Sequence, residues 1–247
     1  MSIESAADLA GLRAVADVVR RTLDLLELRV RPGVTTAELD AAAAALLAAH
    51  GARSAPAMVY GFPGTVLISL NEEIVHGVPG PRVIEAGDLV KLDVTVELDG
   101  YVADAARTVT IAPAGDLAQR LAACALSAFD AGLGVARAGV KVNAIGRAVE
   151  REVRRHGFAV VGGLAGHGVG RTIHEEPSVP NWYDAWQTDV LTRGLVLTIE
   201  PMISAGSPHT VQERDGWTLR TKDRSLSAHH EHTLVITDGA PIVLTAA

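Results

Sequence analysis

Residues 89–111, LVKLDVTVELDGYVADAARTVTI, constrain the fold more than any other stretch of the chain, because they predict a β-hairpin. From Val90 to Leu98, apolar side chains alternate with polar ones, which is the period of a half-buried strand. Asp99 and Gly100 then form a strong signal for a two-residue turn. Two paired antiparallel strands are therefore expected at the centre of the fold.

This hairpin would carry two carboxylates on one face. If Leu98 and Tyr101 flank the turn, the cross-strand pairs are Thr95 with Asp104 and Asp93 with Ala106. Asp93 and Asp104 then become diagonal neighbours, with Cβ atoms roughly 7–8 Å apart or slightly closer. Two carboxylates this close repel each other unless a cation or a shared proton lies between them. Their separation suits two divalent ions about 3.5–4 Å apart.

The net charge and the single cysteine limit the ligands that the chain can take. A net charge of −7, without a cluster of Lys and Arg, argues against direct binding of nucleic acid or of an anionic membrane surface. Cys124 is the only cysteine, so neither a disulfide nor a thiolate metal site is expected. The first residues lack a secretory signal, and no stretch approaches 18 uninterrupted apolar residues. A cytoplasmic protein with oxygen and nitrogen metal ligands is expected.

Helices and strands appear in the same order twice along the chain. Periodicity and cap residues predict helices at about 4–29, 35–51, 116–137 and 143–157, and strands at 65–70, 195–199 and 231–237. The residues Arg31, Gly33, Val34, His50 and Gly51 recur 106 positions later as Arg137, Gly139, Val140, His156 and Gly157. This repeat predicts one domain over residues 1–247, made of similar halves at roughly 1–113 and 114–247, with a site at their junction.

A glycine-rich segment, GHGVGRTIHEEP at residues 166–177, contains His167 and His174. It is not a dinucleotide-binding fingerprint, because that motif would need glycine in place of Arg171. It is not a zincin helix either, because Ser178 stands where the second histidine would be required. Glycines on both sides of His167 would instead allow close approach of the backbone to a ligand or a metal.

Two glutamates lie at the ends of apolar strands: Glu200 in LVLTIEP and Glu231 in HEHTLVIT. An acid in such a position costs free energy unless it is paired. Taken alone, each candidate acid or histidine could be a solvated, salt-bridged or structural residue. Together they supply five donors without a thiolate, which suits a pair of Mn, Fe, Co or Zn ions. The set is Asp93, Asp104, His167, Glu200 and Glu231.

Five motifs, spaced over nearly the whole chain, carry a family resemblance. They are HGVPG from His76, KLDVTVELDGYVADAARTVTI, GHGVGRTIHEEPSVPNW, LTIEPM and TKDRSLSAHHEHTLVITDG. In this order they resemble type I methionine aminopeptidases of the pita-bread fold; the second half lacks the insertion of type II, and the N-terminus resembles the short bacterial form. The resemblance implies an α+β fold, in which two pseudo-symmetric helix-helix-strand halves form a curved antiparallel sheet covered by helices, with the site at its centre.

The resemblance also implies roles for individual residues. Metal would be bound by Asp93, Asp104, His167, Glu200 and Glu231, with Asp104 and Glu231 bridging two ions. Glu200 would be the general base, His174 would stabilise the oxyanion, and His76 would contact the scissile nitrogen. A metal-activated water would attack the scissile carbonyl. The implied enzyme is a methionyl aminopeptidase, which removes the initiator methionine when the second residue is small.

The pocket for the methionine side chain departs from the family pattern. Its expected residues are Tyr60, Phe62, Leu67, Ile173 and Trp217, with contacts from His76 and His174. Leu67 and Val75 stand where family members usually carry cysteines, Tyr60 where they carry a histidine, and Ile173 where an aromatic residue is frequent. These side chains can still line a pocket for an unbranched thioether. The histidines beside Glu231, namely His229, His230 and His232, could orient ligands, and at least one is expected on the surface.

Two other functions fit part of this pattern. A Xaa-Pro aminopeptidase or dipeptidase of the same fold usually carries an extra N-terminal domain, and a non-catalytic peptide-binding protein of this fold typically lacks some of the ligands. The expected partners are N-terminal methionyl peptides of nascent chains, with transient ribosome association and no direct contact with nucleic acid or membrane. A monomer is expected, because the chain has no long exposed apolar stripe.

Overall fold

A computed structural model of the chain describes residues 1–246. Its helices are α1 (Ala6–Arg29), α2 (Thr36–Ala49), α3 (Ala55–Tyr60), α4 (Asp116–Leu133) and α5 (Val142–Arg155). The first two begin at capping boxes, formed by Ser5 with Asp8 and by Thr35 with Glu38. None of the helices within residues 1–246 combines the length and the apolar character that a membrane crossing requires.

The helices of the second half depart from the predicted bounds. α4 ends at Leu133, earlier than the predicted 137, with Gly134 as its C-cap. The cap predicted at Asn143 is wrong, because Lys141 occupies the N-cap of α5 and no side chain caps that helix. The carbonyl of Asp189 instead accepts the first helical N–H, from Val142, at 2.9 Å. The short helix α3 is not predicted, because six residues carry too little periodicity.

One large antiparallel sheet joins the two parts of the chain. The strands are β1 (Arg53–Ser54), β2 (Leu67–Leu70), β3 (Glu73–Val75), β4 (Leu89–Leu98), β5 (Tyr101–Thr110), β6 (Ala159–Val160), β7 (Ala165–Gly168), β8 (Glu175–Pro180), β9 (Val196–Ile199), β10 (Met202–Ser204), β11 (Thr210–Gln212), β12 (Leu219–Thr221), β13 (Ser227–His229), β14 (Glu231–Val235) and β15 (Ile242–Val243). The large sheet has the order β1-β4-β5-β14-β9-β7-β8, with β2 beside β4 and β15 beside β14. Its central connection is β5 to β14, where Glu231 pairs with Ala106 and His232 with Ala105.

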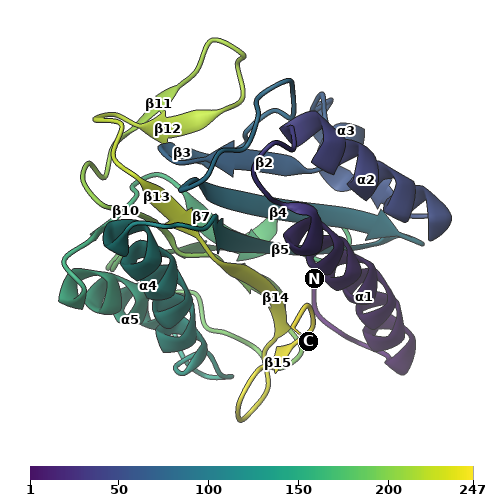
Figure 1. The fold of residues 1–247 in the computed structure, drawn as a ribbon. Helices are drawn as coiled ribbons and strands as arrows, with labels where there is room; N and C mark the ends of the chain where they lie inside the picture. Colours follow the sequence, from purple (N-terminus) through teal and green to yellow (C-terminus); the bar gives the residue numbers. More distant parts are fainter. Residues whose placement is uncertain (247) are drawn as a thin grey trace.

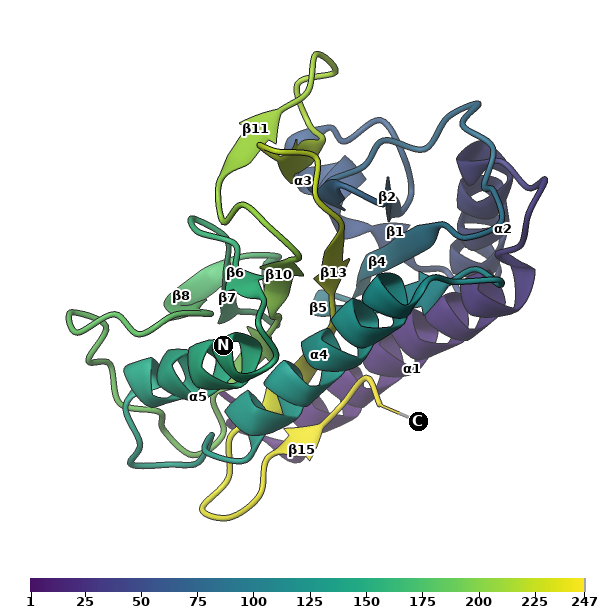
Figure 2. The same cartoon turned by 60° about the vertical axis from the view of Figure 1, so that its left-hand side comes forward.

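Each half of the sheet is packed against its own pair of helices (Figures 1 and 2). One apolar core lies between α1, α2 and strands β2, β4 and β5, and a second lies between α4, α5 and the strands of the second half. These two cores agree with the α+β architecture that the family resemblance implies. The assignment of residues 1–247 to a single domain with halves meeting near residue 113 stays a prediction.

The hairpin of β4 and β5 has the predicted register. Leu98 faces Tyr101 across the turn, and the pairs Thr95 with Asp104 and Asp93 with Ala106 are formed. The prediction that this strand is half-buried is wrong, because its polar face is covered as well as its apolar face. Lys91 is only 1% exposed, its Nζ donates to the carbonyl of Asn71 at 2.7 Å, and burial lowers its pKa to about 7.

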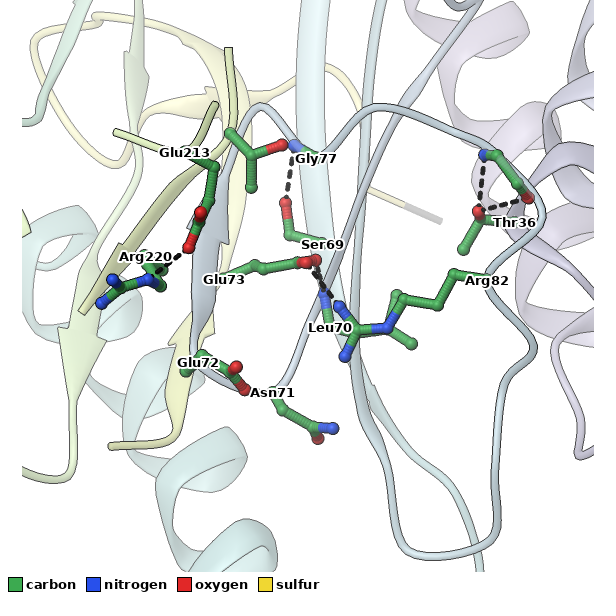
Figure 3. Close-up of polar contacts among 12 residues, drawn as sticks. Thr36, Ser69, Leu70, Asn71, Glu72, Glu73, Gly77, Arg82, Glu213 and Arg220 are labelled. Atoms are coloured by element: carbon green, nitrogen blue, oxygen red, sulfur yellow. Dashed lines mark hydrogen bonds and ion pairs between the residues drawn. The ribbon is translucent and has the colours of Figure 1, made fainter. Parts of the chain in front are cut away.

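The small sheet of β11, β12 and β3 is not predicted from the sequence, because strands of three residues are too short to show a period. It supports the segment that leads into His76, a residue with a left-handed φ of 60°. The β2–β3 connection is further held by side chains (Figure 3): Ser69 Oγ accepts from the N–H of Gly77 at 3.0 Å, and Glu73 accepts from the N–H of Leu70 at 2.7 Å and pairs with Arg82. The turn that carries His76 is therefore held in place by these contacts and by the small sheet.

Candidate metal centre

The predicted site residues converge on one cavity of about 560 Å³ between the two halves of the chain. Both hairpin strands, the β7–β8 segment, the residue after β9, β14 and the β11–β12 connection contribute to its wall. All twelve site residues expected from the sequence line it, together with Val75: Tyr60, Phe62, Leu67, His76, Asp93, Asp104, His167, Ile173, His174, Glu200, Trp217 and Glu231. Residues from widely separated motifs therefore line one cavity, and the position of this cavity at a junction of two similar halves stays a prediction.

Acidic side chains at the floor of this cavity come from strands that are distant in sequence. Donor atoms of Asp104, His167 and Glu231 lie within 4.8 Å of one another, and so do those of Asp93, His229 and Glu231. Asp104 Oδ1 and Glu231 Oε1 are buried and have no hydrogen-bond partner among residues 1–246. Buried polar atoms of this kind require a partner that the chain itself does not provide.

Burial raises the pKa of every carboxyl group in this cluster. It raises the pKa of Asp104 to about 6. Burial, and then the negative charge of Asp104, raise the pKa of Asp93, of Glu200 and of Glu231 well above the usual range. Four acids that repel one another in this way are stabilised in their charged form by a multivalent cation.

His167 presents a neutral imidazole to the same cluster. Its Nδ1 donates to the carbonyl of Gly168 at 2.9 Å, which leaves the Nε2 lone pair directed at the acids, 3.4 Å from Glu200 Oε1. Burial lowers the pKa of His167 to about 4, so the ring is unprotonated at neutral pH. An unprotonated nitrogen of fixed tautomer is what a metal ligand requires.

The glycines around His167 have a different role from the one expected. A Cβ on Gly166 would lie 2.6 Å from the carbonyl oxygen of Thr198, and one on Gly168 would lie 2.2 Å from that of Glu176. The close approach is therefore to the neighbouring backbone of β9 and β8 and not to a ligand. Glycine at these positions lets β7 pack tightly enough to bring His167 to the acids.

Glu200 is held at the end of β9 by several contacts. Thr198 Oγ1 donates to its Oε1 at 2.9 Å, and Asn181 Nδ2 donates to its carbonyl oxygen at 3.0 Å. β9 ends at Ile199, and Pro201, which has no N–H to donate, follows Glu200 directly. The carboxylate therefore has a defined orientation toward the cavity.

Aromatic and imidazole side chains line the outer part of the cavity. Tyr60 Oη lies 2.5 Å from His174 Nδ1, and the rings of His174 and His167 are 4.3 Å apart. Phe62 and Trp217 meet edge to face with centroids 5.3 Å apart. These aromatic side chains and Leu67 form the apolar wall of the cavity, and the two imidazoles lie beside it. A cavity with such a wall suits a peptide whose first side chain is apolar.

The expectation that one of the three histidines near Glu231 lies on the surface is wrong. His229 is 1% exposed and points toward the acids, with Nε2 at 3.7 Å from Glu231 Oε2. His230 and His232 lie on the other side, with their rings 5.3 and 5.2 Å from that of Phe129 in α4. His229 ends β13 and Glu231 begins β14, so the period of a single strand did not predict that His229 would face the acids.

The donor set fits a divalent metal. Carboxylates and neutral imidazole without thiolate are the ligands of Mn, Fe, Co and Zn sites, and two buried carboxylate oxygens have no partner in the described part of the chain. With a large apolar-walled cavity above such acids, the fold and the site define a metal-dependent hydrolase of the peptidase class.

Comparison with known proteins agrees with this class. The sequence model of metallopeptidase family M24 matches residues 10–238. The chain belongs to this family. Methionine aminopeptidase 2 of Bacillus subtilis is 39% identical over 247 residues, which is 99% of each chain. The structure of methionine aminopeptidase from Rickettsia prowazekii matches with a TM-score of 0.95 at 35% identity, over 100% of both chains.

The structural match confirms the predicted fold, with a curved antiparallel sheet covered by helices in the pita-bread arrangement. A prolidase from Pyrococcus furiosus matches with a TM-score of 0.80 at 20% identity. The match covers 99% of this chain and 65% of that protein, and at this identity it shows a shared fold alone.

Proposed function

We propose that this protein is a methionine aminopeptidase, which removes the N-terminal methionine of a peptide by metal-dependent hydrolysis when the second residue is small. One observation carries the proposal: acids and an imidazole from both halves of the chain meet at the floor of a cavity with an apolar wall. The high identity to curated methionine aminopeptidases over the full chain supports the same activity.

The proposal includes two divalent ions, Co, Mn, Fe or Zn, held by Asp93, Asp104, His167, Glu200 and Glu231. Two groups of donors share Glu231, which supports a bridging role for this carboxylate, and Asp104 is proposed as the second bridge. When bound, such ions supply acidification of a water molecule and polarisation of the scissile carbonyl.

Within this site, Glu200 is the proposed general base. Its carboxylate takes the proton of the attacking water and transfers it to the leaving amine, and Thr198 keeps it oriented for both transfers. His174 donates a hydrogen bond to the developing oxyanion. His76, in the turn after β3, contacts the scissile nitrogen. One such donor contributes roughly 10²–10³ in rate.

The methionine side chain occupies the apolar wall in this proposal. Phe62 and Leu67 are buried, at 4% and 6% exposure, and Ile173 is 5% exposed, so they offer a preformed surface. Tyr60 and Trp217 complete it nearer the opening. An unbranched thioether fills such an irregular pocket better than a β-branched side chain does.

A peptide panel tests the activity. The expected result is cleavage of Met-Ala-Ser and Met-Gly-Ser, no cleavage when the second residue is bulky, and loss of activity after chelation with recovery on addition of Mn, Fe, Co or Zn. Efficient cleavage of Leu- or Pro-initiated peptides, with none of Met-initiated ones, would overturn the assignment. No activity with any metal would favour a non-catalytic peptide-binding protein.

The Xaa-Pro alternative is not favoured by the comparisons, because the prolidase likeness stands at 20% identity and extends to the fold alone.

Nascent chains are the natural source of N-terminal methionyl peptides. We therefore infer a cytoplasmic enzyme that meets its substrate at the ribosome transiently and acts as a monomer.

A further inference from the structure

His229 is a buried imidazole whose two ring nitrogens find no partner within residues 1–246. Its side chain is 1% exposed, and in this part of the chain neither Nδ1 nor Nε2 has a hydrogen-bond partner. Leaving a buried polar group unsatisfied costs free energy, so such a ring points to a ligand that the chain itself does not supply.

The backbone of His229 is held on both sides, so the direction of its Cα–Cβ bond is fixed. Its N–H donates to Thr108 Oγ1 at 2.9 Å, and the same hydroxyl donates back to its carbonyl at 2.7 Å. On the other side, His229 pairs with Met202 of β10. The ring therefore projects into the acid cluster from a rigid strand.

The distances from the ring are those of donors that share an ion. His229 Nε2 lies 3.7 Å from Glu231 Oε2 and 3.8 Å from Glu200 Oε2. Both separations are too long for a hydrogen bond, which has heavy atoms at about 2.7–3.2 Å. Donors bound to one ion at about 2.0–2.2 Å lie roughly 3–4 Å apart.

The two groups of converging donors have the same composition. One contains Asp104, His167 and Glu231, and the other contains Asp93, His229 and Glu231. We propose that His229 is a sixth metal ligand, which gives the ion at Asp93 its own imidazole as His167 does for the ion at Asp104. This inference rests on the dinuclear site of the proposed function.

A second imidazole changes which metals the site prefers. Imidazole suits Fe, Co and Zn, whereas Mn prefers carboxylate and other oxygen ligands. The ion at Asp93 therefore binds Co or Zn more tightly, relative to Mn, than it would with carboxylates alone. The variant His229→Gln, which keeps a polar side chain but removes the imidazole, should reduce this preference.

Metal titration of the full-length apoprotein by calorimetry tests the proposal. In His229→Gln, one of two Co²⁺ binding steps should weaken roughly 10–100-fold while the other is unchanged. The variant His230→Gln is the matched control, because its ring packs on Phe129 away from the acids, and it should keep both steps. Equal affinities of native protein and His229→Gln for both ions would overturn the proposal.

X-ray absorption of the Co²⁺-loaded native protein provides a test that does not depend on a variant folding. If the spectrum shows two imidazole ligands for the two bound ions, the proposal is supported. If it shows one imidazole ligand for the two ions, the proposal is overturned. A native protein that binds no divalent ion would overturn the proposed function together with this inference, whereas two ions with one imidazole would overturn this inference alone.

Discussion

Thr198 links the imidazole and the acid that face each other across the metal centre. Its hydroxyl donates to Glu200 Oε1 at 2.9 Å and accepts the backbone N–H of His167 at 3.1 Å. Thr198 is 0% exposed, and its single hydroxyl oxygen fixes both the position of β7 and the orientation of the Glu200 carboxylate. The consequence is that a neutral residue controls the geometry of two proposed ligands.

Replacing this hydroxyl should weaken the site without removing a ligand. In Thr198→Val, a side chain of similar shape leaves Glu200 free to rotate and the N–H of His167 unpaired, so metal affinity or kcat should fall about 10–100-fold. Thr22→Val, the same change at a buried threonine of α1, is the control. Native kcat and native metal content in Thr198→Val would show that Thr198 does not orient Glu200.

Removing the base should nearly abolish turnover. Glu200→Gln keeps the size of the side chain but cannot accept a proton, so kcat should fall by about 10²–10⁴-fold. Metal content should be measured in parallel, because Glu200 is also a proposed ligand. Glu97→Gln changes another buried carboxylate, one paired with Arg53 outside the cavity, and should leave kcat unchanged. Wild-type kcat in Glu200→Gln would remove this residue from the role of base.

Tyr60 should act through His174. A phenol that donates to Nδ1 leaves the hydrogen of His174 on Nε2, where it can serve the oxyanion. Tyr60→Phe should therefore lower kcat, by less than the roughly 10²–10³-fold expected for His174→Ala, and keep the metal content. In the double variant, the loss should equal that of His174→Ala alone, whereas additive losses would show that the two residues act separately.

A methyl group on Gly166 should disturb the packing that brings His167 to the acids. The new Cβ would lie 2.6 Å from the carbonyl oxygen of Thr198, so Gly166→Ala should lower the free energy of unfolding by about 1–3 kcal/mol, as measured in urea. Metal affinity should fall as well, because β7 moves away from β9. Gly80→Ala is the control, since the nearest atom to its Cβ would be 4.0 Å away. Equal stability of both variants would contradict the packing argument.

Metal binding should release protons and become tighter as the pH rises through about 6. Because the pKa of Asp104 is raised to about 6, the folded apoprotein holds a proton there that the unfolded chain has already lost between about pH 4 and 6. The stability of the apoprotein therefore falls as pH rises through this range. A divalent ion binds the charged carboxylate, so it displaces that proton. Calorimetry in two buffers of different ionisation enthalpy measures the release, and an affinity that is constant from pH 5 to 7 would contradict it.

Local sequence determined the hairpin, its register and the identity of its acids. A period of two residues and the Asp99-Gly100 turn act between neighbours in the chain, so the pairing of Thr95 with Asp104 followed without knowledge of the rest. The helix starts at Ser5 and Thr35 depend equally on contacts within four residues.

Only the tertiary structure decided which faces are covered and which distant donors meet. Lys91 and Glu97 are buried because other segments pack over the polar face of β4. His229 joins the acids because β14 pairs with β5 at Ala106 and the backbone of His229 in β13 binds the hydroxyl of Thr108. Burial and proximity of this kind are set by packing between elements far apart in the sequence. No local pattern encodes them, because the free energy of such contacts exists only in the assembled core.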